Sequence, residues 1–132
     1  MEIRVTKYQH TSGTDGLALS VVRTEPADGG DVCGAVILLH GMCEHKGRYE
    51  AFVNFLAEQG YIVTIYDHRG HGESVRDLGD LGYLYEGGYE AMLADIHEMV
   101  LEAKEYAADR TGRTDLPFYM IAHSMGTLCA RC

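Results

Sequence analysis

The stretch Pro117-Phe-Tyr-Met-Ile-Ala-His-Ser-Met-Gly126 decides the fold of this 132-residue chain. Its first six residues form a short apolar run, which has the length of a buried strand. Small side chains, Ala122 and Gly126, stand two positions before and two positions after Ser124. This spacing is typical of a sharp turn from strand to helix that lifts the serine hydroxyl clear of a sheet. The stretch therefore predicts Ser124 as a nucleophile, with His123 and Gly126 supporting the turn.

Ala122 is a departure from the usual G-x-S-x-G pattern of such a turn, because it replaces the first glycine. One additional methyl group is a small intrusion at that position. The alternative interpretation is a chance S-x-G sequence at the end of a strand. The apolar strand before the serine, and the helix expected after it, favour the nucleophile.

The rest of the chain alternates strands with helices. Two continuous apolar runs, Cys33–Leu39 and Tyr61–Tyr66, predict strands that are covered on both faces, as in a parallel sheet. Apolar residues at helical spacing predict helices over Arg48–Gln59 and Tyr89–Ala108. Alternating patterns at the start predict an antiparallel hairpin of two strands, Ile3–Tyr8 and Leu17–Thr24. This order predicts one α/β domain with right-handed parallel crossovers.

Three motifs resemble those of the monoacylglycerol lipase and lysophospholipase group of α/β-hydrolases, which is of the serine aminopeptidase S33 type. Residues 40–49 (HGMCEHKGRY) resemble H-G-x-G-E-H-x-x-R-Y, residues 67–74 (DHRGHGES) resemble D-x-R-G-H-G-x-S, and residues 122–126 resemble G-H-S-M-G. Residues 88–100 resemble the helix before the nucleophile strand. The resemblance implies the N-terminal half of an α/β-hydrolase fold and a serine hydrolase of carboxylic esters. It also implies monoacylglycerol-like or lysophospholipid-like substrates.

An oxyanion hole is expected beside the nucleophile. In α/β-hydrolases its two backbone N–H donors come from the loop after an early strand and from the residue after the nucleophile. In this chain the donors would be Met42 and Met125, and such donors typically contribute a few kcal/mol each to transition-state stabilisation. His40 is expected to be buried and, with Gly41, to brace the loop without transferring protons. Cys43 stands where the group has glycine, which could narrow or strain the hole.

The remaining triad residues are expected outside these 132 residues. In the group the order along the chain is Ser, then Asp, then His. Only residues 125–132 follow the serine, and none of them is Asp, Glu or His. We therefore expect a partial domain over residues 1–132 that has little esterase activity alone. Its last strand, residues 117–122, would be an exposed edge that favours self-association or pairing with a complementary fragment.

Weaker motifs point to other chemistry, and each is incomplete. A dinucleotide loop would need a third glycine after Gly70-His-Gly72, and a zinc site would need a second pair beside Cys129-Ala-Arg-Cys132. His68 and His71 lack a third metal ligand. A catalytic role for either histidine with Asp67 would require a rewired triad. Asp67 and Arg69 are instead expected to bind each other or the loop backbone. The sequence predicts neither a cofactor nor a metal.

Composition narrows the partners. The formal net charge is −9 and the 11 basic residues are scattered, which argues against a nucleic-acid partner. Residues 1–9 lack the apolar segment of a signal peptide, and no apolar run has the length of a membrane span, so a cytoplasmic location is expected. Because a fold does not determine a substrate, an aminopeptidase or a thioesterase remains an alternative, as does a non-catalytic association module.

Overall fold

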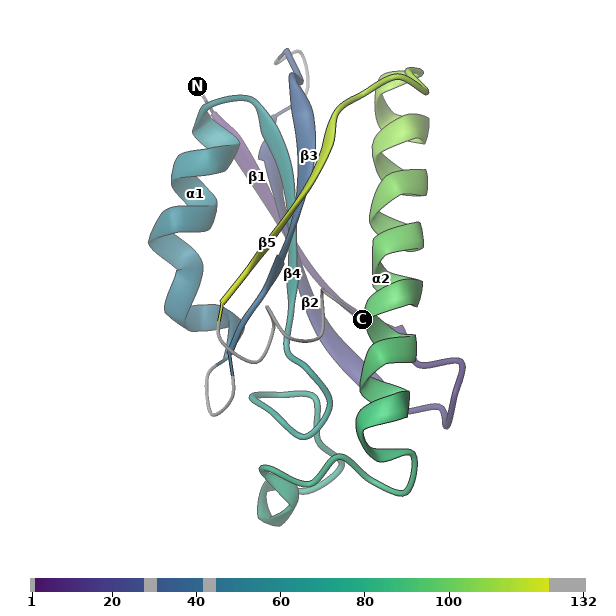
Figure 1. Ribbon diagram of the computed structural model, residues 1–132. Helices are drawn as coiled ribbons and strands as arrows, with labels where there is room; N and C mark the ends of the chain where they lie inside the picture. The colour runs from purple at the N-terminus through teal and green to yellow at the C-terminus, as the bar shows by residue number, and fades with distance from the viewer. Residues whose placement is uncertain (1, 28–30, 42–44, 124–132) are drawn as a thin grey trace.

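In the described part of the chain, five strands form one mixed sheet in the order β1-β2-β4-β3-β5. The computed structural model describes residues 2–27, 31–41 and 45–123. The strands are β1 (Ile3–Thr11), β2 (Ala18–Pro26), β3 (Gly34–Leu39), β4 (Tyr61–Tyr66) and β5 (Phe118–Ala122). The helices are η1 (Lys46–Tyr49), α1 (Glu50–Glu58), η2 (Leu78–Asp80) and α2 (Gly88–Thr111). Helix α1 covers one face of the sheet and α2 covers the other (Figure 1).

The pairing of the strands agrees with the predicted α/β architecture. Strands β1 and β2 form the expected antiparallel hairpin, and β2 pairs antiparallel with β4. Strand β3 lies between β4 and β5 and is parallel to both. The predicted helix over residues 48–59 is divided, because the chain first makes a turn of 3₁₀ helix before α1 begins. Helix α2 ends at Thr111 and is capped by Gly112, whose φ of 69° is the left-handed conformation that glycine adopts readily.

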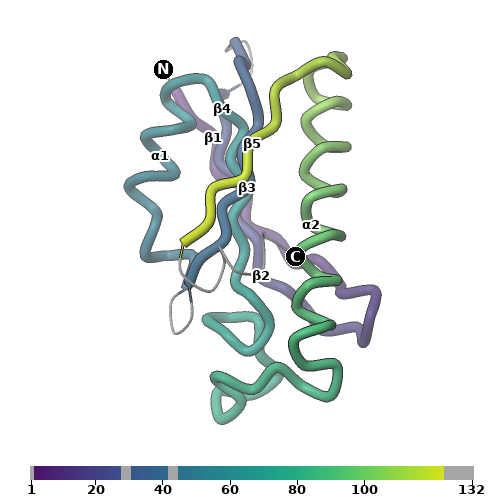
Figure 2. Tube along the Cα trace, viewed as in Figure 1, coloured from purple at the N-terminus to yellow at the C-terminus, as the bar shows by residue number. Residues whose placement is uncertain are grey.

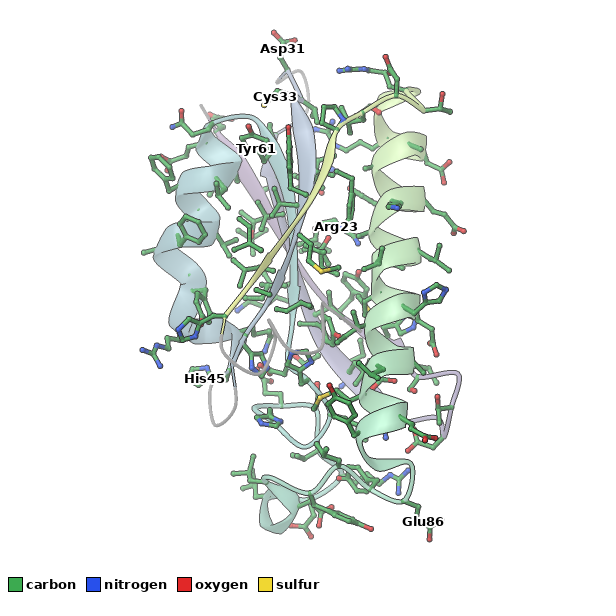
Figure 3. All side chains as sticks on the ribbon, viewed as in Figure 1. Arg23, Asp31, Cys33, His45, Tyr61 and Glu86 are labelled. Carbon is green, nitrogen blue, oxygen red and sulfur yellow. The ribbon has the colours of Figure 1, made fainter. Side chains whose placement is uncertain are left out.

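Alternate residues of β3 face different helices, which explains why this strand is apolar throughout. Ile37 and Leu39 belong to the core beneath α2, whereas Leu38 belongs to the smaller core beneath α1. Arg23 lies between the sheet and α2 (Figure 3), with its guanidinium carbon 3.9 Å from the centre of the Tyr106 ring. Arg23 also pairs with Glu102 at 2.7 Å. Helix α2 is therefore held to the hairpin by buried charge as well as by apolar packing.

Strand β5 differs from the buried strand that its apolar sequence predicts. Its only strand partner among the described residues is β3, so it forms an edge of the sheet, as expected for this chain. Consequently Tyr119, Met120 and Ile121 are 51%, 40% and 36% exposed. Apolar side chains that would suit an interior position here contact solvent.

The carboxyl ends of β3, β4 and β5 gather at the same end of the sheet (Figure 2). Ligands of open α/β sheets bind outside the carboxyl ends of the parallel strands. A ligand site is therefore expected among the residues that follow these three strands. No helix in the part of the chain that the structure describes is both long and apolar enough to cross a membrane.

Candidate active site

The ends of β3 and β5 bring two predicted site segments together. Leu39 is the register partner of Ala122, and the backbone N–H of His123 donates to the carbonyl of Leu39 at 3.1 Å. His40 directly follows β3, and His123 directly follows β5. The residues that lead into the predicted oxyanion loop and into the predicted nucleophile turn are therefore hydrogen-bonded neighbours.

Four of the predicted site residues lie outside the described residues: Met42, Ser124, Met125 and Gly126. The assignments of the nucleophile and of both oxyanion donors therefore stay predictions. The structure describes the other three, which are His40, Gly41 and His123. The side chain of His123 is exposed, whereas His40 and Gly41 are buried.

Both ring nitrogens of His40 are engaged within the loop. Its Nε2 accepts a hydrogen bond from the backbone N–H of His68 at 2.9 Å, so the proton of the neutral ring resides on Nδ1. Nδ1 lies 2.7 Å from the carbonyl of Gly41 and donates to it. This tautomer joins the end of β3 to the end of β4. In this arrangement both nitrogens of the His40 ring are already engaged in hydrogen bonds.

Asp67, the first residue after β4, is buried and joins two loops. One carboxylate oxygen accepts from the backbone N–H of Lys46 at 2.7 Å, and the other accepts from Lys46 Nζ and from the N–H of Glu73, both at 2.9 Å. Burial alone would lower the pKa of Lys46, but its hydrogen bonds to Asp67 and Glu73 raise it. The prediction that Asp67 binds Arg69 or loop backbone is therefore right for the backbone, while the cation is Lys46.

Arg69 is fully buried and binds the β1–β2 turn and α2. Its Nε lies 2.7 Å from Asp95, and its terminal nitrogens lie 2.9 Å from Asp15 and 3.2 Å from the hydroxyl of Ser12. A further contact reaches the carbonyl of Leu84 at 3.3 Å. Burial acts to lower the pKa of Arg69, but the carboxylates of Asp15 and Asp95 raise it. The ionic network supports the loop after β4 from below.

His68, the second residue after β4, has a buried imidazole. Its ring contacts His40 edge-on, with 4.4 Å between the ring centroids, and within the described part of the chain neither of its nitrogens has a hydrogen-bond partner. Burial, together with the nearby rings of His40 and His71, lowers the pKa of His68 to about 3. Nδ1 of His71 lies 3.0 Å from the carbonyl of Arg69. Since the Asp67 carboxylate is occupied by other donors, it orients neither histidine, and the rewired triad receives no support.

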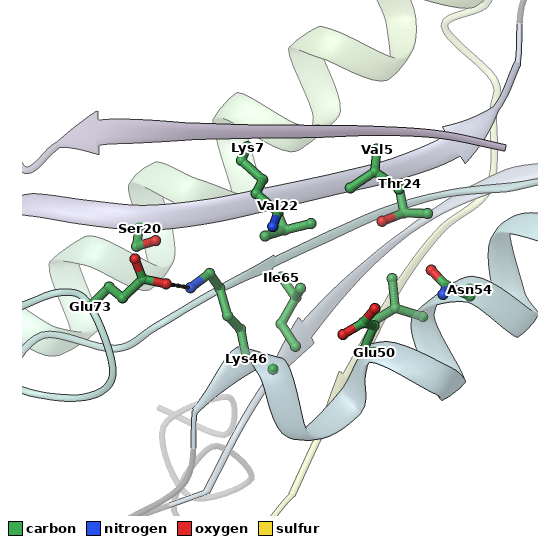
Figure 4. A pocket seen from close by; sticks show the side chains of 12 residues that line it. Val5, Lys7, Ser20, Val22, Thr24, Lys46, Glu50, Asn54, Ile65 and Glu73 are labelled. Atoms are coloured by element: carbon green, nitrogen blue, oxygen red, sulfur yellow. Dashed lines mark hydrogen bonds and ion pairs between the residues drawn. The ribbon is translucent and has the colours of Figure 1, made fainter.

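The described ranges 2–27, 31–41 and 45–123 contain no group of three His, Cys, Asp or Glu side chains placed to hold a metal ion. They do contain a pocket of about 270 Å³, which lies between α1 and the sheet (Figure 4). Apolar side chains line it beside a rim of mixed charge that includes the Lys46–Glu73 ion pair. Its lining residues come from β1, β2, β4, α1 and the segments around Lys46 and Glu73, and none of them belongs to β3 or β5.

Sequence reasoning missed Lys46 and Asp95 as parts of the site's support. Lys46 sits in a polar segment and carries no signal of its own. Asp95 does carry one, because it is a carboxylate on the same helical face as buried Met92, Ile96 and Met99. An acidic residue in an apolar helix stripe indicates a buried basic partner.

A mixed sheet with an N-terminal antiparallel hairpin, flanking helices and a candidate site at its carboxyl edge defines the class of α/β-hydrolases. A thermostable carboxyl esterase from Bacillus coagulans superposes with a TM-score of 0.78 at 28% identity, over 96% of this chain and 38% of that chain. Residues 30–131 match the family described as "Serine aminopeptidase, S33", and the chain belongs to this family.

Curated relatives carry lipid-hydrolase names. The monoacylglycerol lipase of Mycolicibacterium smegmatis is 33% identical over 97 residues, which are 73% of this chain and 30% of the lipase. The probable lysophospholipase L2 of Haemophilus influenzae is 32% identical over 96 residues, which are 72% of this chain and 28% of that protein. The resemblance predicted from the motifs is confirmed. The chain spans less than a third of the length of these relatives.

Proposed function

We propose that this chain contributes the nucleophile and the oxyanion hole of a serine hydrolase that cleaves carboxylic esters of lipid-like molecules. The observation that carries the proposal is the hydrogen bond from His123 to Leu39. It holds together the two segments that lead directly into the predicted nucleophile and the predicted oxyanion donor. An acyl-transfer site needs these two elements side by side.

In the proposed reaction, Ser124 Oγ attacks the ester carbonyl carbon while a general base takes its proton. The N–H groups of Met42 and Met125 stabilise the negative oxygen of the tetrahedral intermediate. Collapse of that intermediate expels the alcohol, which receives the proton, and water then hydrolyses the acyl-enzyme. The base and its orienting acid would come from a part of the protein beyond these 132 residues.

Monoacylglycerols and lysophospholipids are the proposed substrates. The names of the two curated relatives support this class. The thioether side chains of Met42 and Met125 would suit an apolar acyl chain. The description of the matched family favours a second candidate, an aminopeptidase.

A cytoplasmic location also stays a prediction.

The test compares substrates on the protein expressed from the full reading frame that contains this chain. We expect hydrolysis of 1-monoacylglycerol and lysophosphatidylcholine, no release from aminoacyl p-nitroanilides, and complete loss of turnover in Ser124→Ala. The 132-residue chain alone should hydrolyse p-nitrophenyl butyrate about three to six orders of magnitude more slowly, since it lacks the later triad residues.

Preferential cleavage of the anilides would identify the aminopeptidase. Ester turnover that survives Ser124→Ala would reject the assigned nucleophile. Rapid turnover by the 132-residue chain would show that the base lies within it. If neither protein hydrolyses any substrate and the chain only associates through β5, a non-catalytic module is the better description.

A further inference from the structure

We propose that Asp67 and His68 form a two-point clamp on the residues that flank the oxyanion loop: His40 and Gly41 before it, and Lys46 after it. The inference rests on the proposed function, because that function assigns a transition-state donor to this loop. Asp67 and His68 are consecutive, and they follow β4, the strand that pairs with β3 on the side away from β5. They contact the residues on both sides of the loop and would act on catalysis only through it.

The first point of the clamp holds the start of the loop. The backbone N–H of His68 donates to Nε2 of His40 at 2.9 Å, and Nδ1 of the same ring donates to the carbonyl of Gly41 at 2.7 Å. The position of Gly41 is therefore transmitted from β4 through one imidazole. His40 and His68 are each at most 1% exposed, so water does not compete for these bonds.

The second point holds the end of the loop. The Asp67 carboxylate accepts from the backbone N–H of Lys46 at 2.7 Å and from Lys46 Nζ at 2.9 Å. Lys46 is the first residue of η1, so this bond sets where the loop ends and the helix begins. A hydrogen bond to a carboxylate is roughly twice as strong as one between neutral groups.

The clamp is itself fixed to the sheet. The N–H of Asp67 donates to the carbonyl of Ser20 in β2, and the hydroxyl of Ser74 donates to the carbonyl of Asp67 at 2.7 Å. Gly72 has a φ of +51°, and a side chain there would collide with the Asp67 carboxylate. Both ends of the loop are thus bonded to the same dipeptide, Asp67-His68.

This arrangement matters because an oxyanion hole works through preorganised donors. Displacing a catalytic group by about 1 Å can cost about a hundredfold in rate. The oxyanion exists only in the transition state, so a displaced donor lowers kcat and changes KM little. Asp67 is therefore a positioning residue, and it acts through the hydrogen bond that its carboxylate accepts from the backbone N–H of Lys46.

Two substitutions at one position isolate that bond. Lys46→Pro removes both the N–H and the amine, whereas Lys46→Met removes only the amine. Proline suits the first position of a helix, and His45 before it is extended (φ −151°, ψ 163°), as a residue before proline should be. Comparing the two variants therefore measures the backbone donor with little added strain.

Both variants are made in the protein from the full reading frame. We expect kcat for 1-monoacylglycerol to be about ten- to a hundredfold lower in Lys46→Pro than in Lys46→Met, with KM within about threefold. Hydrogen exchange of the amides of residues 41–45 should be faster in Lys46→Pro, while the amides of β3 keep their protection. Equal melting temperatures of the two variants would exclude general destabilisation.

Each readout can overturn the inference separately. Equal kcat values in the two variants would show that the clamp does not position the oxyanion donor. Equal exchange over residues 41–45 would show that the Lys46 N–H does not hold the loop. A wild-type protein without Ser124-dependent hydrolysis would refute the proposed function, and the exchange comparison would still decide whether the clamp exists.

Discussion

At the scale of single residues, the most unusual group is His68. A buried imidazole that has no hydrogen-bond partner among the described residues resists protonation, and the rings of His40 and His71 lie beside it. Its pKa in the folded protein is about 3, below the ordinary value of 6.5. The unfolded chain therefore binds a proton that the folded chain excludes at intermediate pH.

Stability is accordingly expected to fall on acidification. Above pH 6.5 the ring is neutral in both the folded and the unfolded state, so it does not make stability depend on pH. Between pH 6.5 and about 3 the ring is protonated in the unfolded state but not in the folded state, so stability is lost progressively as the pH falls. Urea unfolding at about pH 7 and about pH 4.5 measures this. His68→Phe should reduce the loss, whereas the exposed control His97→Gln should not. Identical pH dependence in wild type and His68→Phe would contradict the assignment.

At the scale of elements, β5 is the exception to the rule that this sheet buries its apolar strands. Exposed edge strands present unpaired backbone groups that can pair with another chain. Here the edge also exposes three consecutive large apolar side chains, Tyr119, Met120 and Ile121. Both properties favour association through β5, either with a second copy or with a complementary segment.

Met120→Lys is expected to shift the 132-residue chain toward the monomer on a sizing column, because a charged side chain on an edge strand opposes strand pairing. Leu101→Lys is the matched control: Leu101 is 48% exposed, close to the 40% of Met120, but it lies on α2. If both variants elute like the wild type, β5 is not the associating surface. A wild-type chain that is a uniform monomer would show that the 132-residue chain does not associate at all.

A second element-scale prediction concerns Gly72, in the turn after β4. Gly72→Ala should destabilise the protein by about 1–3 kcal/mol or more, because a positive φ is combined with a collision against the Asp67 carboxylate. Gly88→Ala provides the control, since Gly88 has a similar φ of +54° and no atom within 4 Å of an added Cβ. Equal melting temperatures of the two variants would show that the contact with Asp67 is unimportant.

At the scale of the whole molecule, the sequence predicts the strands and helices well because their apolar patterns are local. The continuous runs of β3 and β4 correspond to strands covered on both faces, and the pattern of residues 89–108 lies within α2. The partners of Asp67 and Arg69 could not be predicted in this way. They depend on which distant segments the sheet order brings together, and charge alone did not distinguish Lys46 from Arg69 as the partner of Asp67.

Arg69 joins parts of the chain that are far apart in sequence. Its partners Ser12 and Asp95 are 57 residues before it and 26 residues after it. The guanidinium therefore cannot complete its pairing until an 84-residue span from the first turn to the middle of α2 has been made. During synthesis from the N-terminus, the hairpin and the loop after β4 leave the ribosome before Asp95. The Arg69 network can therefore form completely only after the first half of α2 has been synthesised.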